Sequence, residues 1–276
     1  MIRKYLINFL KNTLIFFSIF IVVFPLLYLV ITSLRPQNEF LSDINIFPKS
    51  ITFEHYYHVF GNQNAFKYTL NSLSITSIVT ILSIIFGSMA GYALARSKIK
   101  KKFVLTLILF FIFIRFYPRI AVVVPWFLII RDLNLLDTIW AVIILHLGLT
   151  TPFVVWLMYT FYKGIPKELE ESAAIDGAGY ISRYLKIVLP LSLPGIATAS
   201  IFTAFLSWNE FLLASSITRE SAKTLPVSIA GFVTDKGVLW GPMMAMSSLI
   251  VIPMIIFSLS LQKYLIKGIM LGAVKE

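Results

Sequence analysis

The 276-residue sequence contains no cysteine and has few charged residues. Without cysteine, the chain forms neither a disulfide framework nor a thiolate metal site, and its redox compartment cannot be read from this absence. Charged residues make up 13% of the chain and hydrophobic residues 58%, with a mean hydropathy of +0.85. This composition is too apolar for an ordinary soluble domain. The sequence therefore indicates an integral membrane protein.

Motifs for catalysis and for cofactor binding are also missing. The sequence has no Walker A loop, no Gly-rich phosphate cradle, no Ser-His-Asp order and no His/Glu metal spacing. We therefore expect no catalytic, cofactor-binding or metal-binding residue in this chain. Any ATP hydrolysis would need a separate subunit.

Acidic residues are scarce relative to basic ones, giving a net charge of +11. In a soluble chain this excess could indicate nucleic-acid binding. Here the lysines cluster beside apolar runs, which is typical of contact with anionic lipid and of the positive-inside rule. We expect membrane lipid as a partner and no nucleic acid.

Long apolar runs predict an all-α polytopic membrane protein with a cytoplasmic N-terminus over residues 1–12 and one six-span domain over residues 13–276. A span needs about 20 apolar residues. The first run resembles a signal peptide but lacks a small-residue cleavage site, so it stays as an anchor. In the second run, Gly87, Ala90 and Gly91 offer a small-residue face for helix packing. The predicted spans cover residues 13–34, 68–95, 103–130, 138–162, 195–217 and 239–262.

Basic residues set the expected orientation. Of the 24 lysines and arginines, 15 fall in the N-terminus, the turn after the second span, residues 163–194 and the C-terminus. Seven fall on the opposite side, and Arg115 and Arg119 lie within the membrane. The positive-inside rule therefore places both termini and residues 166–190 in the cytoplasm of a multi-pass cell-membrane protein.

Residues 166–190 form the longest stretch of the second half that a bilayer would not hold. Pro166 suits the first turn of a helix, and Glu168 and the carboxylates that follow suit its dipole. Gly177 supplies a left-handed position that ends this helix, and residues 180–188 read as a second short helix. From composition alone, this segment is either a surface for another protein or a simple amphipathic connection.

The segment also contains a spaced set of residues: Glu171, Ser172, Ala173, Gly177, Ile187, Leu189 and Pro190. This spacing resembles the EAA loop of ABC importer permeases, and we call residues 166–190 the EAA-like loop. Ser172 stands where the family's first alanine is expected, a change of one hydroxyl. Asp176 and Ala178 flank the glycine as in the family.

Further segments are similar to the carbohydrate branch of these permeases, including the smaller permease of maltose-type importers. They cover residues 52–56, 71–73, 90–96, 208–211, 224–227 and 272–275. The resemblance implies a sugar or oligosaccharide importer with a second, homologous permease, two ATPase subunits that bind ATP and Mg, and an extracytoplasmic sugar-binding protein. It also implies that contact with the ATPase involves Glu170, Glu171, Ser172, Ala173, Asp176, Gly177 and Ala178.

Ionisable groups at membrane depth are candidate pathway residues, because their desolvation is costly unless protein or water surrounds them. Glu210, with Trp208 and Asn209, either lines the route or anchors the span at the interface. Arg115 and Arg119 lie one helical turn apart, and either line a cavity, snorkel or pair with Glu210. We interpret His146 as a hydrogen-bonded packing residue rather than a proton relay.

Two other functions remain open at this stage. An ion- or proton-coupled secondary transporter would use Glu210, Arg115 and His146, and would leave the EAA-like spacing as coincidence. A membrane scaffold without transport would do the same. Co-purification with an ATPase subunit distinguishes the importer from both.

Overall fold

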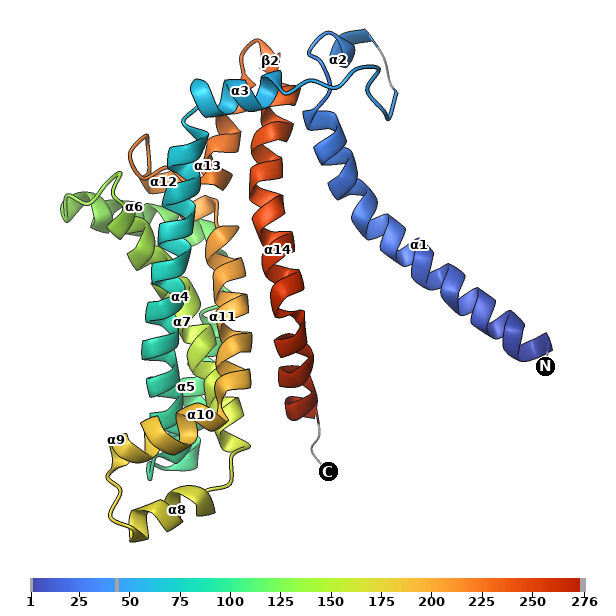
Figure 1. Cartoon of the computed structure of the whole chain (residues 1–276). Helices are drawn as coiled ribbons and strands as arrows, with labels where there is room; N and C mark the ends of the chain where they lie inside the picture. Colours follow the sequence, from blue (N-terminus) through green and yellow to red (C-terminus); the bar gives the residue numbers. More distant parts are fainter. Residues whose placement is uncertain (1, 43–44, 274–276) are drawn as a thin grey trace. The chain divides into compact units, whose positions relative to one another are not determined.

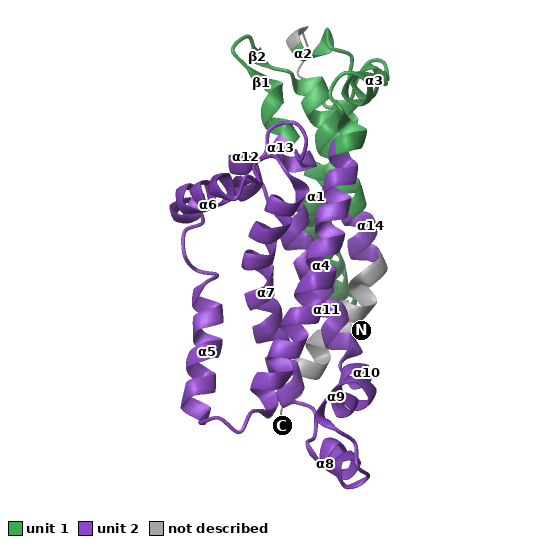
Figure 2. Ribbon diagram, turned by 90° about the vertical axis from the view of Figure 1, so that its left-hand side faces the viewer, with its two compact units in different colours: residues 1–67, 228–253 green, residues 68–227, 254–276 purple. Residues whose placement is uncertain are grey.

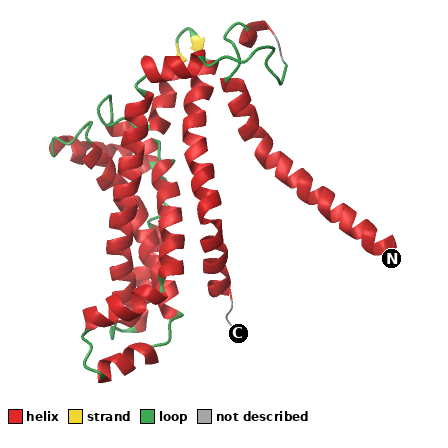
Figure 3. Ribbon diagram, in the orientation of Figure 1, coloured by secondary structure: helices red, strands yellow, loops and turns green. Residues whose placement is uncertain are grey.

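The computed structural model describes the backbone of residues 2–42 and 45–273, and the side chains of residues 4–40 and 45–259. The chain divides into two compact units, one of residues 1–67 and 228–253 and one of residues 68–227 and 254–276 (Figure 2). In the part of the chain that the structure describes, helices provide the regular structure apart from one two-stranded hairpin (Figure 3). The all-α prediction is confirmed.

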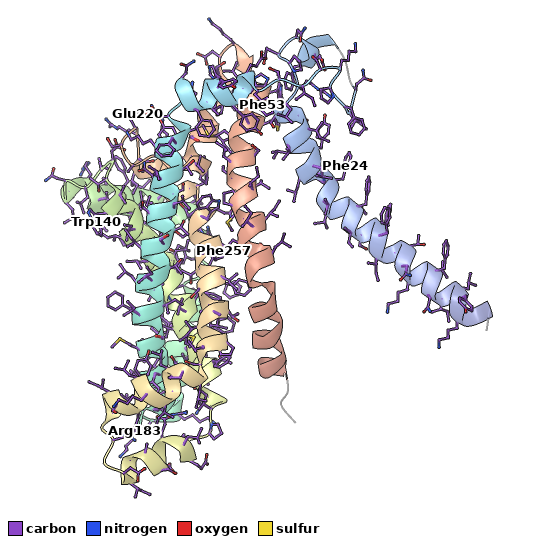
Figure 4. All side chains as sticks on the ribbon, viewed as in Figure 1. Phe24, Phe53, Trp140, Arg183, Glu220 and Phe257 are labelled. Carbon is purple, nitrogen blue, oxygen red and sulfur yellow. The ribbon has the colours of Figure 1, made fainter. Side chains whose placement is uncertain are left out.

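The first unit contains α1 (Ile2–Ser33), α2 (Glu39–Ser42), α3 (Glu54–Gly61), the 3₁₀ turn η2 (Ala230–Phe232), the strands β1 (Val233–Thr234) and β2 (Gly237–Val238), and the start of α14 (Trp240–Ala273). The Tyr56 hydroxyl joins three of its elements, lying 2.7 Å from Ser33 Oγ and 2.9 Å from Ser248 Oγ. Along α1, apolar side chains such as Phe16 and Phe24 are exposed, as expected of a helix that meets lipid or another subunit (Figure 4).

The second unit contains a bundle around α7, whose side chains are the most enclosed among the candidate spans. Helices α5 and α11 pack along α7 (Figure 1). Its elements are α4 (Ala65–Arg96), α5 (Lys101–Phe113), α6 (Ile120–Asp132), α7 (Ile139–Lys163), α8 (Glu168–Ile175), α9 (Tyr180–Arg183), the π-helix η1 (Tyr184–Val188), α10 (Leu189–Leu191), α11 (Leu193–Trp208) and α12 (Leu212–Ile217), and α13 (Leu225–Ile229) crosses into the first unit.

Small residues let α4 approach α7. A Cβ atom added at Gly87 would lie 2.7 Å from Val154 Cβ, and one at Gly91 would lie 2.9 Å from the Tyr159 backbone nitrogen. Real side chains do not reach such distances, so only glycine fits at these two positions. The prediction of a small-residue packing face on the second span is confirmed.

The predicted third span, residues 103–130, is not one helix. Helix α5 ends at Phe113 and α6 begins at Ile120. Pro118 lacks an amide hydrogen, and its ring clashes with the carbonyl of Ile114 in a helix, while Tyr117 before it is pushed out of helical geometry. The same break separates Arg115 from Arg119, so the expectation that they share one helical face is wrong.

Four of the described helices are long and apolar enough to cross a membrane alone: Lys4–Ser33 of α1, α4, α7 and Trp240–Leu259 of α14. The predicted fifth span is interrupted after Trp208, where α11 ends, and continues as the short α12. The helix of the sixth span continues to Ala273, beyond the predicted end. The count of six spans in one domain stays a prediction.

Residues 218–238, which join the predicted fifth and sixth spans, are partly structured. This segment carries α13 and η2 and ends in the hairpin. Its first half is bound to the start of α4: the Tyr68 hydroxyl donates to Glu220 Oε2 at 2.8 Å, and Asn71 Nδ2 donates to the carbonyls of Ser221 and Lys223, each at 2.9 Å. These bonds satisfy backbone groups that a free loop would leave to water.

Candidate functional site

The EAA-like loop consists of two short helical segments joined at Gly177. Helix α8 has three carboxylates in its first turn, where the helix dipole favours negative charge. Gly177 has φ +85°, its amide donates to Ala174 O at 3.1 Å, and the amide of Ala178 donates to Ala173 O at 2.9 Å. This pair of bonds is the Schellman motif. The prediction that Gly177 ends the helix in a left-handed position is confirmed.

The second segment begins at Tyr180 as α9, continues through η1 and ends at Leu191. It meets α11 at 77°, and the bend lies at Ser192. The proline at position 190 lies within α10, and the one at position 194 lies in the first turn of α11, where its missing amide hydrogen costs nothing. The chain therefore turns between two prolines that start helices and do not themselves break one.

One face of α8 is open to solvent. Ile175 is 88% exposed at its C-terminal end, and Leu169 is 46% exposed near its start. Glu171 and Ser172 are also exposed. The Ser172 hydroxyl donates to Glu168 O at 2.9 Å, so the departure from alanine adds no unsatisfied group. This face offers apolar side chains and carboxylates to another molecule.

Glu170 points the other way and is 5% exposed. Its Oε1 lies 2.6 Å from Arg96 Nε, and its Oε2 accepts from the Tyr92 hydroxyl at 2.6 Å. Glu170 therefore differs from the other predicted coupling residues, because its side chain holds α8 against α4 rather than facing a partner.

Tyrosine rings surround this contact. The Tyr92 ring lies 4.8 Å from that of Tyr184 and 5.1 Å from that of Tyr180, measured between centroids. The Arg183 guanidinium lies 5.8 Å from the Tyr180 centroid, at the place labelled in Figure 4. Burial, and then the negative charge of Glu170, raises the pKa of Tyr180, so its hydroxyl stays protonated at neutral pH. The second segment is thereby packed on α4.

A second polar cluster lies where α11 ends. The Glu210 carboxylate accepts from the amides of Leu213 and Ala214, both at 3.0 Å, and its Oε2 lies 3.4 Å from His146 Nε2. His146 Nδ1 lies 2.9 Å from Ser207 Oγ. The two amides lie in the first turn of α12 and have no partner within that helix, so the carboxylate provides their acceptor and they provide its donors. His146 is buried and hydrogen-bonded, as predicted.

Sequence comparison decides the family. The model of the family described as "Binding-protein-dependent transport system inner membrane component" matches residues 83–270. The chain belongs to this family. It is a membrane-spanning permease subunit of a binding-protein-dependent ABC importer.

Individual relatives agree along nearly the whole permease. It is 31% identical over 255 residues to the diacetylchitobiose uptake system permease protein DasC of Streptomyces coelicolor, covering 92% of each chain. It is 32% identical over 259 residues to the trehalose/maltose transport system permease protein MalG of Thermococcus litoralis, again covering 92% of each. The fold is similar to that in a crystal structure of a bacterial ABC transporter that imports the polysaccharide alginate, with a TM-score of 0.78, 23% identity, and 95% and 97% of the two chains covered.

The sequence leaves open whether Trp208, Asn209 and Glu210 line the transport route or anchor the span, and a route role for them stays a prediction. In this permease the side chains of Trp208 and Glu210 are buried within the second unit, at 3% and 2% exposure. Glu210 meets its need for partners inside the chain, which is why it does not have to face water. Asn209 is exposed, and its amide donates to Phe205 O at 2.9 Å.

The suggested pairing of Glu210 with Arg115 or Arg119 is wrong, because its partner is His146. The Arg115 guanidinium instead lies 4.4 Å from the centroid of the Phe153 ring, a cation–π contact. Arg115, Phe153 and Trp156 help line a cavity of about 330 Å³. A pathway role for Arg115, Arg119 and Asn209 stays a prediction.

Sequence reasoning assigned no role to Arg96 or Tyr92. Both lie in the segment of residues 90–96, whose similarity to other permeases implies no role for an individual side chain. Arg96 is also one of the basic residues that follow the predicted second span. The signal that could have found them is the charge of Glu170, since a carboxylate on the apolar side of a short helix needs a cation nearby. Among the described residues, no cluster of three histidines or carboxylates could hold a metal ion.

Proposed function

We propose that this permease imports a sugar or an oligosaccharide together with a second, homologous permease, two ATPase subunits and an extracytoplasmic binding protein. Support for the substrate class comes from the curated relatives, whose names specify diacetylchitobiose and trehalose or maltose. Support for the ATPase contact comes from one observation, the open face of α8 with Ile175 at its tip. ATP and Mg would bind to the ATPase subunits.

The chemistry of this face fits a protein partner. Ile175 is a large apolar side chain with no cover, and the carboxylates of Glu171 and Asp176 next to it are exposed. An apolar knob with charged neighbours is the arrangement that a pocket with a basic rim would bind. In the proposed cycle, closure of the ATPase dimer moves α8, and the two permeases open outward to accept sugar. ATP and the binding protein need only favour the outward state.

The alternative of an ion- or proton-coupled transporter is contradicted by the family to which the chain belongs. It would use Glu210, His146 and Arg115 along a route, but Glu210 and His146 bind one another and backbone or hydroxyl groups in the interior. Nor does a secondary transporter or a scaffold give a reason for the open face of α8.

The test of the ATPase contact is co-purification. An affinity-tagged permease, co-expressed with the ATPase encoded for the same transporter, should retain that ATPase through solubilisation and washing. Ile175→Asp should weaken the association about 10- to 100-fold, because a buried isoleucine contributes about 1.5–3 kcal/mol. At 88% exposure Ile175 contributes little to the fold, so the variant should still insert.

Ile51→Asp is the matched control, since Ile51 is 69% exposed and lies in the segment predicted on the opposite membrane side. It should leave the ATPase bound. A permease that never retains an ATPase, or an Ile175→Asp variant that retains it fully, would refute the proposed contact. The substrate class is tested separately by thermal shift of the cognate binding protein with diacetylchitobiose, trehalose and maltose, with amino acids as the negative set.

A further inference from the structure

Transmission from an ATPase to the membrane requires more than a docking face. Helix α8 is joined to its neighbours in the chain by short non-helical segments, residues 164–167 and 176–179. If these were its only attachments, α8 could follow the ATPase while the membrane helices stayed in place. The question is which contacts make α8 and the spans move together.

The Glu170 carboxylate supplies one such contact, because each of its oxygens is bound by a different side chain of α4. Arg96 Nε binds Oε1 and the Tyr92 hydroxyl binds Oε2, both at 2.6 Å. The side chains of Arg96 and Glu170 are 8% and 7% exposed. Charge-assisted bonds of this length are strong, and at this burial water does not readily replace them.

Arg96 extends the contact to a third helix. Its Nη1 donates to Tyr162 O at 2.9 Å and its Nη2 donates to Ile165 O at 3.0 Å. Tyr162 lies in the last turn of α7 and Ile165 just beyond it, where the helix dipole favours a cation. One guanidinium thus joins the end of α4, the end of α7 and the inner face of α8.

The second segment of the EAA-like loop is attached to the same place. The Tyr184 hydroxyl lies 2.9 Å from Ser88 Oγ of α4, and the Tyr162 ring of α7 lies 5.7 Å from that of Tyr92 and 6.5 Å from that of Tyr184. Both halves of the loop are therefore packed on α4 and α7 through one cluster of buried groups.

We propose that Arg96 and Tyr92 are positioning residues that, through Glu170, lock α8 to α4 and α7 so that movement of the docked ATPase reaches the membrane helices. This inference rests on the proposed function. The link is separable from docking, because Glu170 faces inward and the exposed side chains of α8 face outward. It is separable from the shape of α8, because the Schellman motif at Gly177 uses backbone groups alone.

The experiment uses the full transporter in lipid nanodiscs, with its ATPase and binding protein. The reporter is Ser74→Cys, one introduced thiol at an exposed position of α4 in a chain that has no other cysteine. We measure its maleimide labelling rate with and without MgATP plus vanadate, together with the ATPase rate and the amount of ATPase retained. In the unaltered background, we expect MgATP plus vanadate to change the labelling rate about tenfold. A tenfold change corresponds to about 1.4 kcal/mol in the free-energy difference between the two states.

Glu170→Gln and Arg96→Lys should keep the ATPase bound and hydrolysing ATP. In both variants the labelling rate should be about the same with and without MgATP plus vanadate, because α4 no longer follows α8. Tyr92→Phe keeps the ring contacts and removes one bond, so its effect should be smaller. The double variant Glu170→Arg with Arg96→Glu should not recover the response, because a carboxylate at position 96 cannot donate to Tyr162 O and Ile165 O. Asp132→Asn is the matched control, removing an exposed pair with Arg131, and should respond as the unaltered chain does.

Two outcomes would overturn the inference: a normal nucleotide response in Glu170→Gln and Arg96→Lys, or loss of the ATPase from Glu170→Gln. The second outcome would make Glu170 a docking residue and leave the proposed function intact. Full recovery by the charge exchange would overturn the role of the α7 carbonyls, because the exchanged pair cannot bind them. If instead the unaltered chain retains no ATPase, that result contradicts the proposed function and does not bear on the contact of Glu170 with Arg96 and Tyr92. If Glu170→Gln does not fold, Arg96→Lys decides, and Tyr92→Phe provides a second test that leaves the ion pair in place.

Discussion

At the scale of single residues, Asp137 shows how one carboxylate fixes a surface loop. It lies between α6 and α7 and accepts hydrogen bonds from the backbone amides of Arg219, Glu220, Ser221 and Ala222, at 2.9–3.2 Å. Partial burial alone would raise its pKa, but these four amides outweigh burial and hold the pKa of Asp137 well below its ordinary value. The charged form is therefore the one that stabilises the fold.

We expect Asp137→Asn to lower the free energy of unfolding by on the order of 2 kcal/mol at pH 7, because the amide loses the charge and one acceptor oxygen. Asparagine tolerates the φ of +56° at this position, so backbone strain does not contribute. Because the folded-state pKa is depressed, the stabilisation is complete above the unfolded pKa of about 3.9 and is lost as the pH falls further. Thermal unfolding in detergent should show a constant difference from pH 6 to 8 that shrinks below about pH 4. If the difference in stability between Asp137→Asn and the unaltered chain were the same at pH 3 as at pH 7, the carboxylate charge would not be its cause.

Glu210 leads to a prediction about stability rather than transport kinetics. In Glu210→Gln, the amide offers one acceptor oxygen to two backbone amides, and His146 loses its anionic partner. We expect a loss on the order of 2 kcal/mol, because one buried backbone amide is left without an acceptor, seen as a lower unfolding temperature and less folded protein in the membrane. Asp132→Asn is the control, since that side chain is 65% exposed in its pair with Arg131 and should cost little. Normal stability with altered uptake in Glu210→Gln would return this residue to the transport route.

At the scale of elements, Gly177 separates two possible effects of substitution. Its φ of +85° strains any side chain, at a cost on the order of 1 kcal/mol, yet a Cβ there would meet no atom of this chain within 4 Å. We expect Gly177→Val to insert normally and to lose both ATPase-coupled uptake and ATPase retention, since its branched side chain adds strain and blocks a docked partner. Asparagine tolerates the left-handed conformation, so any loss of ATPase retention in Gly177→Asn would come from the side chain obstructing the partner and not from backbone strain. If valine at this position leaves uptake unchanged, the glycine has no coupling role.

The elements that were predicted correctly are those whose signal is local. The carboxylates at the start of α8, the left-handed Gly177 and the glycines of α4 that pack on α7 all follow from neighbouring residues. The break between α5 and α6 was visible as Pro118, but the length of the apolar run favoured an unbroken span. The partners of Glu170 and Glu210 were missed because Arg96 and His146 are more than 60 residues away, and only the fold brings them together.

At the scale of the whole molecule, the distribution of basic residues carries information that no single helix holds. The excess of lysine and arginine at both termini and in the EAA-like loop predicts that these segments lie in the cytoplasm. The proposed function depends on this orientation, because α8 must lie on the side where ATP is available. Single cysteines in an otherwise cysteine-free chain test it directly.

In intact cells, an impermeant maleimide should not label Lys101→Cys or Ser182→Cys and should label Lys223→Cys and Lys236→Cys. Lys223 is 23% exposed, with its amine 2.5 Å from Glu220 Oε1, whereas Lys236 is exposed at the turn of the hairpin, so labelling should be faster at position 236. Permeabilised cells provide the control, because the first two thiols should then react and show that they are accessible from the cytoplasmic side. Labelling of Ser182→Cys in intact cells would place the EAA-like loop outside the cell, away from ATP, and would refute both the orientation and the ATPase contact that depends on it.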